Sequence, residues 1–150
     1  MIYADTNFYT NVLVDLSDSI EARRLLPQAP SILPITRLLR LEIANALQQC
    51  LYLARHGAQV IRITPEYVAA VRAQFADQVS MGTRFRNRQL DEGAVERVFL
   101  ELCDRHTAKE GFRTYDILHV SSALVLGCDT FWSFDAKAKK LASLEGMKVN

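Results

Sequence analysis

Four acidic residues stand at places where the chain could use them for chemistry. Asp5 follows the apolar run 1–4, and Asp135 follows the aromatic-rich run 130–134. If these two runs are neighbouring parallel strands, both carboxylates lie at the same edge of the sheet. In open α/β sheets ligands bind outside the carboxyl ends of the strands, so this edge is where a site is expected.

The other two acids lie in apolar surroundings. Glu42 occurs in the sequence Leu-Leu-Arg-Leu-Glu-Ile-Ala, and Asp116 occurs in Tyr-Asp-Ile-Leu. Burying a charged group is costly unless it is paired or binds a metal. A cluster of carboxylates suits Mg²⁺ or Mn²⁺, which prefer oxygen ligands. Such ions activate water and polarise a phosphodiester, so the four acids predict metal-dependent phosphodiester chemistry.

Each acid also has a purely structural interpretation. Asp5 could stabilise a turn, as Asp and Asn often do. Glu42 could pair with an arginine of its own helix. Asp116 could interact with a helix dipole, and Asp135 could cap the last helix. No glycine-rich nucleotide loop and no serine nucleophile elbow offers a different chemistry.

The elements that must position these acids alternate along the chain. We expect strands at 1–4, 31–33, 83–90, 130–134 and 147–149, and helices at 19–26, 35–56, 65–81, 91–109, 115–126 and 136–144. Residues 5–7 are expected to form a polar turn, and 60–63 could be a strand or a loop. Strands separated by helices predict an α/β fold with a mainly parallel sheet, in a single domain spanning 1–150.

The boundaries of the helices are marked by specific residues. Thr64 and Pro65 are typical of a helix start, as N-cap and first helical residue, and Gly82 ends the same helix. Thr114 is expected to cap the helix over 115–126. Along 35–56, apolar residues recur at spacings of three and four, which predicts one buried face. That face comprises Leu38, Leu41, Ala44, Leu47 and Leu51.

Composition excludes several classes of protein. The 150 residues are 49% hydrophobic and 23% charged, with a net charge of +1, which excludes a strongly cationic nucleic-acid coat protein. Cys50, Cys103 and Cys128 are too far apart for a CxxC pair and are expected to be reduced thiols. No leader and no membrane span is expected, so the sequence predicts a soluble, cytoplasmic protein.

Several segments resemble one family. They are Tyr3–Asn7, Leu41–Leu47, Arg113–Leu124, Gly127–Asp129 and Trp132–Asp135. In these segments the chain resembles PIN domains, most closely the VapC-type toxins of toxin–antitoxin pairs. The resemblance extends over nearly the whole chain, in the same order and at the same length. Residues 64–90 carry no motif of the family. In this segment we expect substrate choice and partner contacts to vary between family members.

The resemblance implies a metal-dependent ribonuclease with a compact three-layer α/β/α fold. It places an acidic pocket at Asp5, Glu42, Asp116 and Asp135, which would hold Mg²⁺ or Mn²⁺. It places hydroxyl groups that orient ligands or water at Thr6 and Ser133. It also implies an RNA substrate, a cognate antitoxin whose tail covers the active site, and a homodimer.

Five further residues have open roles. Arg113, just ahead of Asp116, could hold a phosphate or tune the acidic pocket. Arg84, Arg86 and Arg88 alternate along a predicted strand, where they could bind RNA phosphates or protect an edge strand from aggregation. His119, three residues after Asp116, could transfer protons or could simply be packed.

Other functions remain as alternatives. A haloacid-type phosphatase needs a second acid two residues after the first, and that position is Asn7. A receiver domain needs an acidic pair that the sequence lacks. A nuclease of RNA processing outside a toxin–antitoxin pair fits equally well. A non-catalytic binding module on the same fold is disfavoured because all four acids are present.

Overall fold

The computed structural model describes residues 1–57 and 63–150, and it divides into two compact units. Unit 1 consists of Met1–Asn7 and Gln89–Asn150, and unit 2 consists of Phe8–Arg88. The strand or loop expected at 60–63 lies outside the described residues apart from Ile63. That one domain spans the whole chain stays a prediction.

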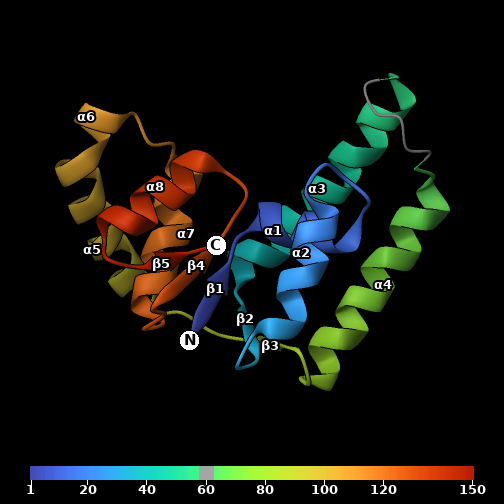
Figure 1. Cartoon of the computed structure of the whole chain (residues 1–150), viewed down its shortest axis with the longest axis horizontal. Helices are drawn as coiled ribbons and strands as arrows, with labels where there is room; N and C mark the ends of the chain where they lie inside the picture. Colours follow the sequence, from blue (N-terminus) through green and yellow to red (C-terminus); the bar gives the residue numbers. More distant parts are fainter. Residues whose placement is uncertain (58–62) are drawn as a thin grey trace. The chain divides into compact units, whose positions relative to one another are not determined.

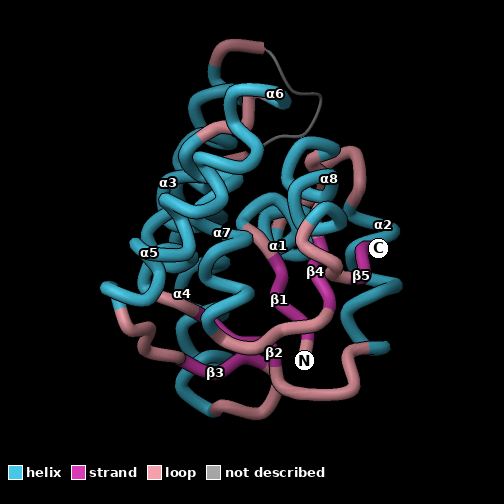
Figure 2. Tube along the Cα trace, turned by 90° about the vertical axis from the view of Figure 1, so that its left-hand side faces the viewer, coloured by secondary structure: helices cyan, strands magenta, loops and turns pink. Residues whose placement is uncertain are grey.

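A parallel three-stranded sheet forms the centre of unit 1. Its order is β1 (Ile2–Ala4), β4 (Thr130–Trp132), β5 (Lys148–Val149), and the three strands lie side by side in Figures 1 and 2. Tyr3 is opposite Phe131 in the register, and their rings stack with centroids 5.7 Å apart. This pairing brings the first residues of the chain to a segment near its end.

Helices of unit 1 pack on one another and on this sheet. They are α5 (Glu92–Leu102), a π-helical turn (Cys103–Thr107), α6 (Ala108–Glu110), α7 (Thr114–Val125) and α8 (Ala136–Leu144). α5 packs on α7, α7 on α8, and α8 against β4 and β5. Glu145 accepts hydrogen bonds from Arg105 and His106, which ties the π-helical turn to the end of α8.

Unit 2 is built around a smaller parallel pair of strands. Its elements are α2 (Ser19–Leu25), a 3-10 turn (Leu26–Gln28), β2 (Leu33–Ile35), α3 (Arg37–Arg55), α4 (Pro65–Met81) and β3 (Phe85–Asn87). Helix α1 (Thr6–Leu13) begins in unit 1 and continues into unit 2. The Tyr9 ring of α1 packs against Phe75 of α4 and Phe85 of β3, forming an aromatic core.

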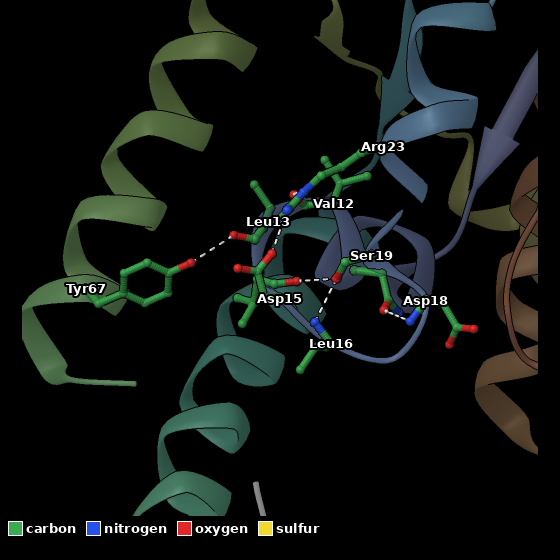
Figure 3. A network of polar contacts seen from close by, with 10 residues as sticks. Val12, Leu13, Asp15, Leu16, Asp18, Ser19, Arg23 and Tyr67 are labelled. Atoms are coloured by element: carbon green, nitrogen blue, oxygen red, sulfur yellow. Dashed lines mark hydrogen bonds and ion pairs between the residues drawn. The ribbon is translucent and has the colours of Figure 1, made fainter. Parts of the chain in front are cut away.

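A network of polar contacts fixes the connection between α1 and α2 (Figure 3). The Ser19 hydroxyl donates to the Val14 carbonyl and accepts the N–H of Leu16. The Tyr67 hydroxyl donates to the Leu13 carbonyl and so links α4 to the end of α1. The backbone groups of this turn therefore have defined partners, as backbone groups outside regular structure require.

Most boundaries agree with the sequence, and the differences have local causes. A helix, α1, begins at Thr6 where a polar turn was expected, since the apolar residues that follow give it a buried face. β2 begins two residues later than predicted. β3 is shorter than the predicted strand over 83–90. α7 begins at Thr114, and the Asp116 carboxylate accepts the N–H of Arg113, so the expected Thr114 cap is wrong.

The buried face of α3 also differs from the prediction. Leu41 is 61% exposed, whereas Leu39 and Ile43 are buried together with Leu47 and Leu51. Both sets of residues satisfy the helical spacing, because the first half of this helix is apolar on several sides. Periodicity alone could not choose between them.

The predicted fold class is confirmed. Every strand pairing among the described residues is parallel, and helices separate the strands along the chain. The strands belong to two sheets, of three and two strands. Within the described ranges no helix is both long and apolar enough to cross a membrane.

Candidate active site

The pairing of β1 with β4 brings Asp5 and Ser133 together. Asp5 directly follows β1 and is only 4% exposed, and its backbone N–H donates to the Trp132 carbonyl. The Ser133 hydroxyl donates to Asp5 Oδ2 at 2.6 Å. Such a short bond to a carboxylate is of the charge-assisted kind. The sheet therefore holds the Asp5 side chain in one orientation at its carboxyl edge.

Asp135 is linked to the same hydroxyl. Its backbone N–H donates to Ser133 Oγ at 2.8 Å. Its Oδ1 atom accepts the N–H groups of Lys137 and Ala138, so Asp135 is the N-cap of α8, as one interpretation of the sequence proposed. The cap uses Oδ1 only. Asp5 and Asp135 are thus joined through one serine hydroxyl.

Ser133 has a third partner, which no motif of the sequence predicted. Its backbone N–H donates to Asn150 Oδ1 at 2.9 Å. The Asn150 carbonyl in turn accepts from Lys139 Nζ at 3.2 Å. No motif in the sequence indicates Asn150. The register of β5 beside β4 is the signal that could have placed it, and this register is a tertiary feature.

Asp116 lies at the start of α7 in the same unit and is half-buried. Its Oδ2 accepts the N–H of Arg113 at 3.0 Å, which caps the helix. A carboxylate in the first turn also suits the helix dipole, so the structural interpretation of Asp116 describes its contact correctly. The Arg113 side chain is exposed, and its role toward a phosphate stays a prediction.

His119 lies one turn further along α7 and connects it to the residues on either side of Asp5. Its Nδ1 is 3.0 Å from the Tyr3 hydroxyl, and its Nε2 is 3.4 Å from Thr6 Oγ1. The imidazole is buried, so His119 is a packed residue with a polar partner at each ring nitrogen. Through it, the helix that carries Asp116 contacts the segment that carries Asp5.

Glu42 lies on α3, in unit 2, and is half-buried. The structure therefore groups Asp5, Asp116 and Asp135 in one unit and places Glu42 in the other.

Three exposed arginines lie in and beside β3. Arg86 is within the strand, and Arg84 and Arg88 flank it. Phe85, between two of them, is 1% exposed, but Asn87 is exposed like the arginines, so the alternation expected from the sequence holds only at Phe85. Arg86 Nη2 lies 3.5 Å from the Gly82 carbonyl. Binding of RNA by these arginines stays a prediction.

The acidic side chains of the described residues do not form a complete set of metal ligands. In the ranges 1–57 and 63–150, no three His, Cys, Asp or Glu side chains form a group that could hold a metal. What the structure provides is a set of fixed carboxylates: one buried, Asp5, and two half-buried at helix starts, Asp116 and Asp135. Oxygen donors of this type suit hard divalent cations.

Comparisons with known proteins bear on the fold. No family model and no curated protein matches this chain in sequence. Two solved structures are similar. VapC20 from Mycobacterium tuberculosis, described as a sarcin-ricin loop cleaving toxin, has a TM-score of 0.67 and 16% identity over 93% of this chain and 94% of its own. FitAcB from Neisseria gonorrhoeae has a TM-score of 0.68 and 12% identity over 99% and 96%. These matches confirm the expected PIN-like α/β fold.

Proposed function

We propose that this chain is a metal-dependent ribonuclease of the VapC type and the toxin of a toxin–antitoxin pair. The observation that carries the proposal is the buried Asp5 carboxylate at the end of β1, held by Ser133 and linked through it to Asp135. The fold that holds this carboxylate is shared with VapC20, a toxin described as cleaving the sarcin-ricin loop.

The residues fit a divalent cation in their chemistry. Asp5, Asp116 and Asp135 of unit 1 would supply oxygen ligands to Mg²⁺ or Mn²⁺, and the resemblance to PIN domains adds Glu42 as a ligand. The helix caps use one oxygen each, Oδ2 of Asp116 and Oδ1 of Asp135. When bound, the ion supplies Lewis-acid activation of water and of the phosphodiester. Like charges repel, so carboxylates are expected to come together only around a cation.

The chain's own residues act by positioning. The Ser133 hydroxyl orients the Asp5 carboxylate, and the cap of α8 fixes Asp135. Thr6, which follows Asp5 in the sequence, is held by its contact with His119. Arg113 is exposed at the start of α7, where its guanidinium could bind a phosphate of the substrate.

The substrate and partners belong to the same proposal. Arg84, Arg86 and Arg88 are exposed along β3 and would bind RNA phosphates. A cognate antitoxin would cover the acidic residues, and two copies of the chain would form a homodimer. The protein would act in the cytoplasm as a single domain over 1–150.

Cleavage of a mixed RNA pool tests the proposal. We expect wild-type protein to cut RNA with Mg²⁺ or Mn²⁺ and to be inactive in EDTA. Asp5→Asn keeps the size of the side chain but removes its charge, and should reduce cleavage by at least about 100-fold, because even outer-shell partners of a metal are worth 10–100-fold. Asp104→Asn is the matched control, since Asp104 is an exposed acid of the same unit.

Thermal melts give a second readout that does not require the correct RNA. Millimolar Mn²⁺ should raise the Tm of the wild type and of Asp104→Asn, and raise that of Asp5→Asn less, because a ligand stabilises the state that binds it. Equal, negligible binding by wild type and Asp5→Asn, with no cleavage by either, would favour the non-catalytic binding module instead.

A further inference from the structure

We propose that Asn150 is a positioning residue for Asp5 and acts through Ser133. The inference rests on the proposed function, since Asp5 is the carboxylate to which that function assigns the chemistry. Two hydrogen bonds carry it. Asn150 Oδ1 accepts the Ser133 N–H at 2.9 Å, and the Ser133 hydroxyl donates to Asp5 Oδ2 at 2.6 Å.

The register of β5 brings Asn150 to this place. β5 runs parallel to β4 with Lys148 opposite Thr130 and Val149 opposite Phe131. Asn150 is the next residue, so its backbone reaches the level at which β4 ends and the turn to α8 begins. Its side-chain oxygen then takes the N–H of the first residue after β4.

A second contact holds Asn150 from the opposite side. Lys139 Nζ donates to the Asn150 carbonyl at 3.2 Å. Lys139 lies on α8, the helix that Asp135 caps. Asn150 is therefore fixed both to the turn that precedes α8 and to α8 itself. This double attachment distinguishes Asn150 from Lys148 and Val149, whose side chains are exposed.

The orientation of the Ser133 hydroxyl depends on this attachment. Ser133 is fully buried, and its Oγ accepts the Asp135 N–H while it donates to Asp5. A hydroxyl has one proton to give, so with the Asp135 N–H as its donor, that proton is directed to Asp5. The Ser133 N–H, in turn, is satisfied by Asn150. A buried N–H without an acceptor is strongly unfavourable, so loss of this acceptor would shift the turn.

The consequence is a specific defect rather than a general one. When Ser133 moves, the Asp5 carboxylate loses its hydrogen bond from the Ser133 hydroxyl, and the site keeps its residues but not their geometry. Substrate contacts elsewhere are unaffected. We therefore expect kcat to fall while KM changes little.

Two substitutions at Asn150 separate the effect of its hydrogen-bond acceptor from the effect of its side-chain shape. Asn150→Leu keeps a similar shape and removes the acceptor, whereas Asn150→Asp keeps an oxygen at the same position. The expected fall in kcat is about 10-fold for Asn150→Leu, the lower end of the range for partners around a metal site. Asn150→Asp should recover most of the wild-type kcat. Lys139→Met, which removes the second attachment, should cause a smaller fall in the same direction.

Met147→Ala is the matched control. Met147 is buried in the same C-terminal segment but has no hydrogen bond to Ser133, so its substitution lowers stability through packing alone. We expect a lower Tm for Met147→Ala with kcat unchanged at a temperature well below the melt. Exchange of the Ser133 amide proton, followed by NMR, should be faster in Asn150→Leu and protected in Asn150→Asp and Met147→Ala.

The outcomes are distinguishable. If wild-type protein cuts no RNA and binds no Mn²⁺, the proposed function fails, and the exchange of the Ser133 amide still tests whether Asn150 holds it. Wild-type kcat in Asn150→Leu, in an enzyme that Asp5→Asn inactivates, overturns the inference. So does a loss of kcat that follows Tm equally in Asn150→Leu and Met147→Ala. If Asn150→Leu does not fold, Lys139→Met decides: an unchanged kcat and Ser133 exchange rate overturn the inference.

Discussion

The two units carry opposite charges. Unit 2 has ten arginines, no lysine and six acids, a net charge of +4, whereas unit 1 has eleven acids against eight basic residues, a net charge of −3. The whole-chain value of +1 conceals this difference. A near-neutral average therefore says little about the partners of a protein, because the distribution of charge decides what each surface attracts.

The units also differ in how their polar groups are held. In unit 1 the carboxylates have fixed partners: Asp5 accepts from the Ser133 hydroxyl, and Asp135 accepts the N–H groups of Lys137 and Ala138. In unit 2 a groove of about 350 Å³ between α3 and α4 has exposed Arg40 and Arg72 among its lining residues. Fixed carboxylates suit a chemical step, and exposed arginines suit attraction of an anionic substrate. Substitutions that disturb the carboxylates of unit 1 should thus change kcat, and substitutions of the exposed arginines of unit 2 should change KM.

Ser133→Ala in unit 1 is expected to have the largest effect among the variants that test this difference between kcat and KM. The variant leaves Asp5 in place but removes the hydroxyl that orients it, and kcat should fall by about 10–100-fold with KM nearly constant. Steady-state kinetics on one RNA substrate measure both constants. Ser143→Ala on α8 is the control, since Ser143 is exposed. A rise in KM with unchanged kcat would contradict the division.

A smaller effect is expected from the arginines of unit 2. Replacing Arg84, Arg86 and Arg88 together by Gln should raise KM by about 10-fold without changing kcat. The salt dependence of binding should weaken by about 0.7 in log–log slope for each lost phosphate contact. Arg24→Gln is the control, because Arg24 is an exposed arginine of the same unit that pairs with Glu21.

The alternative role of these three arginines gives a different result. If they only protect the edge of β3, the triple variant keeps its KM and instead aggregates, because an uncharged edge strand can pair with another chain. Light scattering at increasing protein concentration separates this outcome from the first.

The smallest expected effect is on the pH dependence of stability, and it comes from a buried thiol in each of the two units. Burial raises the pKa of the Cys128 thiol in unit 1 from 9.0 to about 11, and burial also raises the pKa of Cys50 in unit 2. A raised pKa in the folded state means that stability is complete below pH 9 and is lost as the pH rises toward 11. At about 1.36 kcal/mol per pKa unit, the loss from Cys128 is about 2–3 kcal/mol.

Urea unfolding at pH 8 to 11 measures this loss. Cys128→Ala should be less stable at pH 8 because of the cavity, but should lose less stability between pH 9 and pH 11 than the wild type does. Cys50→Ala is the matched variant in unit 2. An identical pH dependence in wild type and Cys128→Ala would show that the thiol stays protonated to the same extent in both states.

Local signals in the sequence predicted elements well where one residue determines the boundary. Thr64, Pro65 and Gly82 mark the ends of α4, and Asp135 caps α8. Helix α1 was missed because Asp5, Thr6 and Asn7 favour a turn locally, and packing of the following residues overrides that preference. The buried face of α3 was misassigned because apolar residues surround its first half.

The residues of the candidate site also fall into those that the sequence could predict and those that it could not. Asp5 and Asp135 could be predicted as neighbours, because each follows a strand and parallel strands end at the same edge, whereas Ser133 was indicated only by the resemblance to PIN domains. Asn150 and the contacts of His119 with Tyr3 and Thr6 could not be predicted. They depend on the register of β5 and on the packing of α7, which are set by contacts between distant parts of the chain.

The pairing of β1 with β4 also determines when the site can exist. Asp5 and Ser133 are 128 residues apart, so they cannot meet until both segments and everything between them have been synthesised. Closing so long a loop makes parallel pairing slow, and β5, which brings Asn150, is made after β4. A nascent or truncated chain would carry the acidic residues without their geometry. The proposed activity would thus require β1, β4 and β5 to be both synthesised and paired.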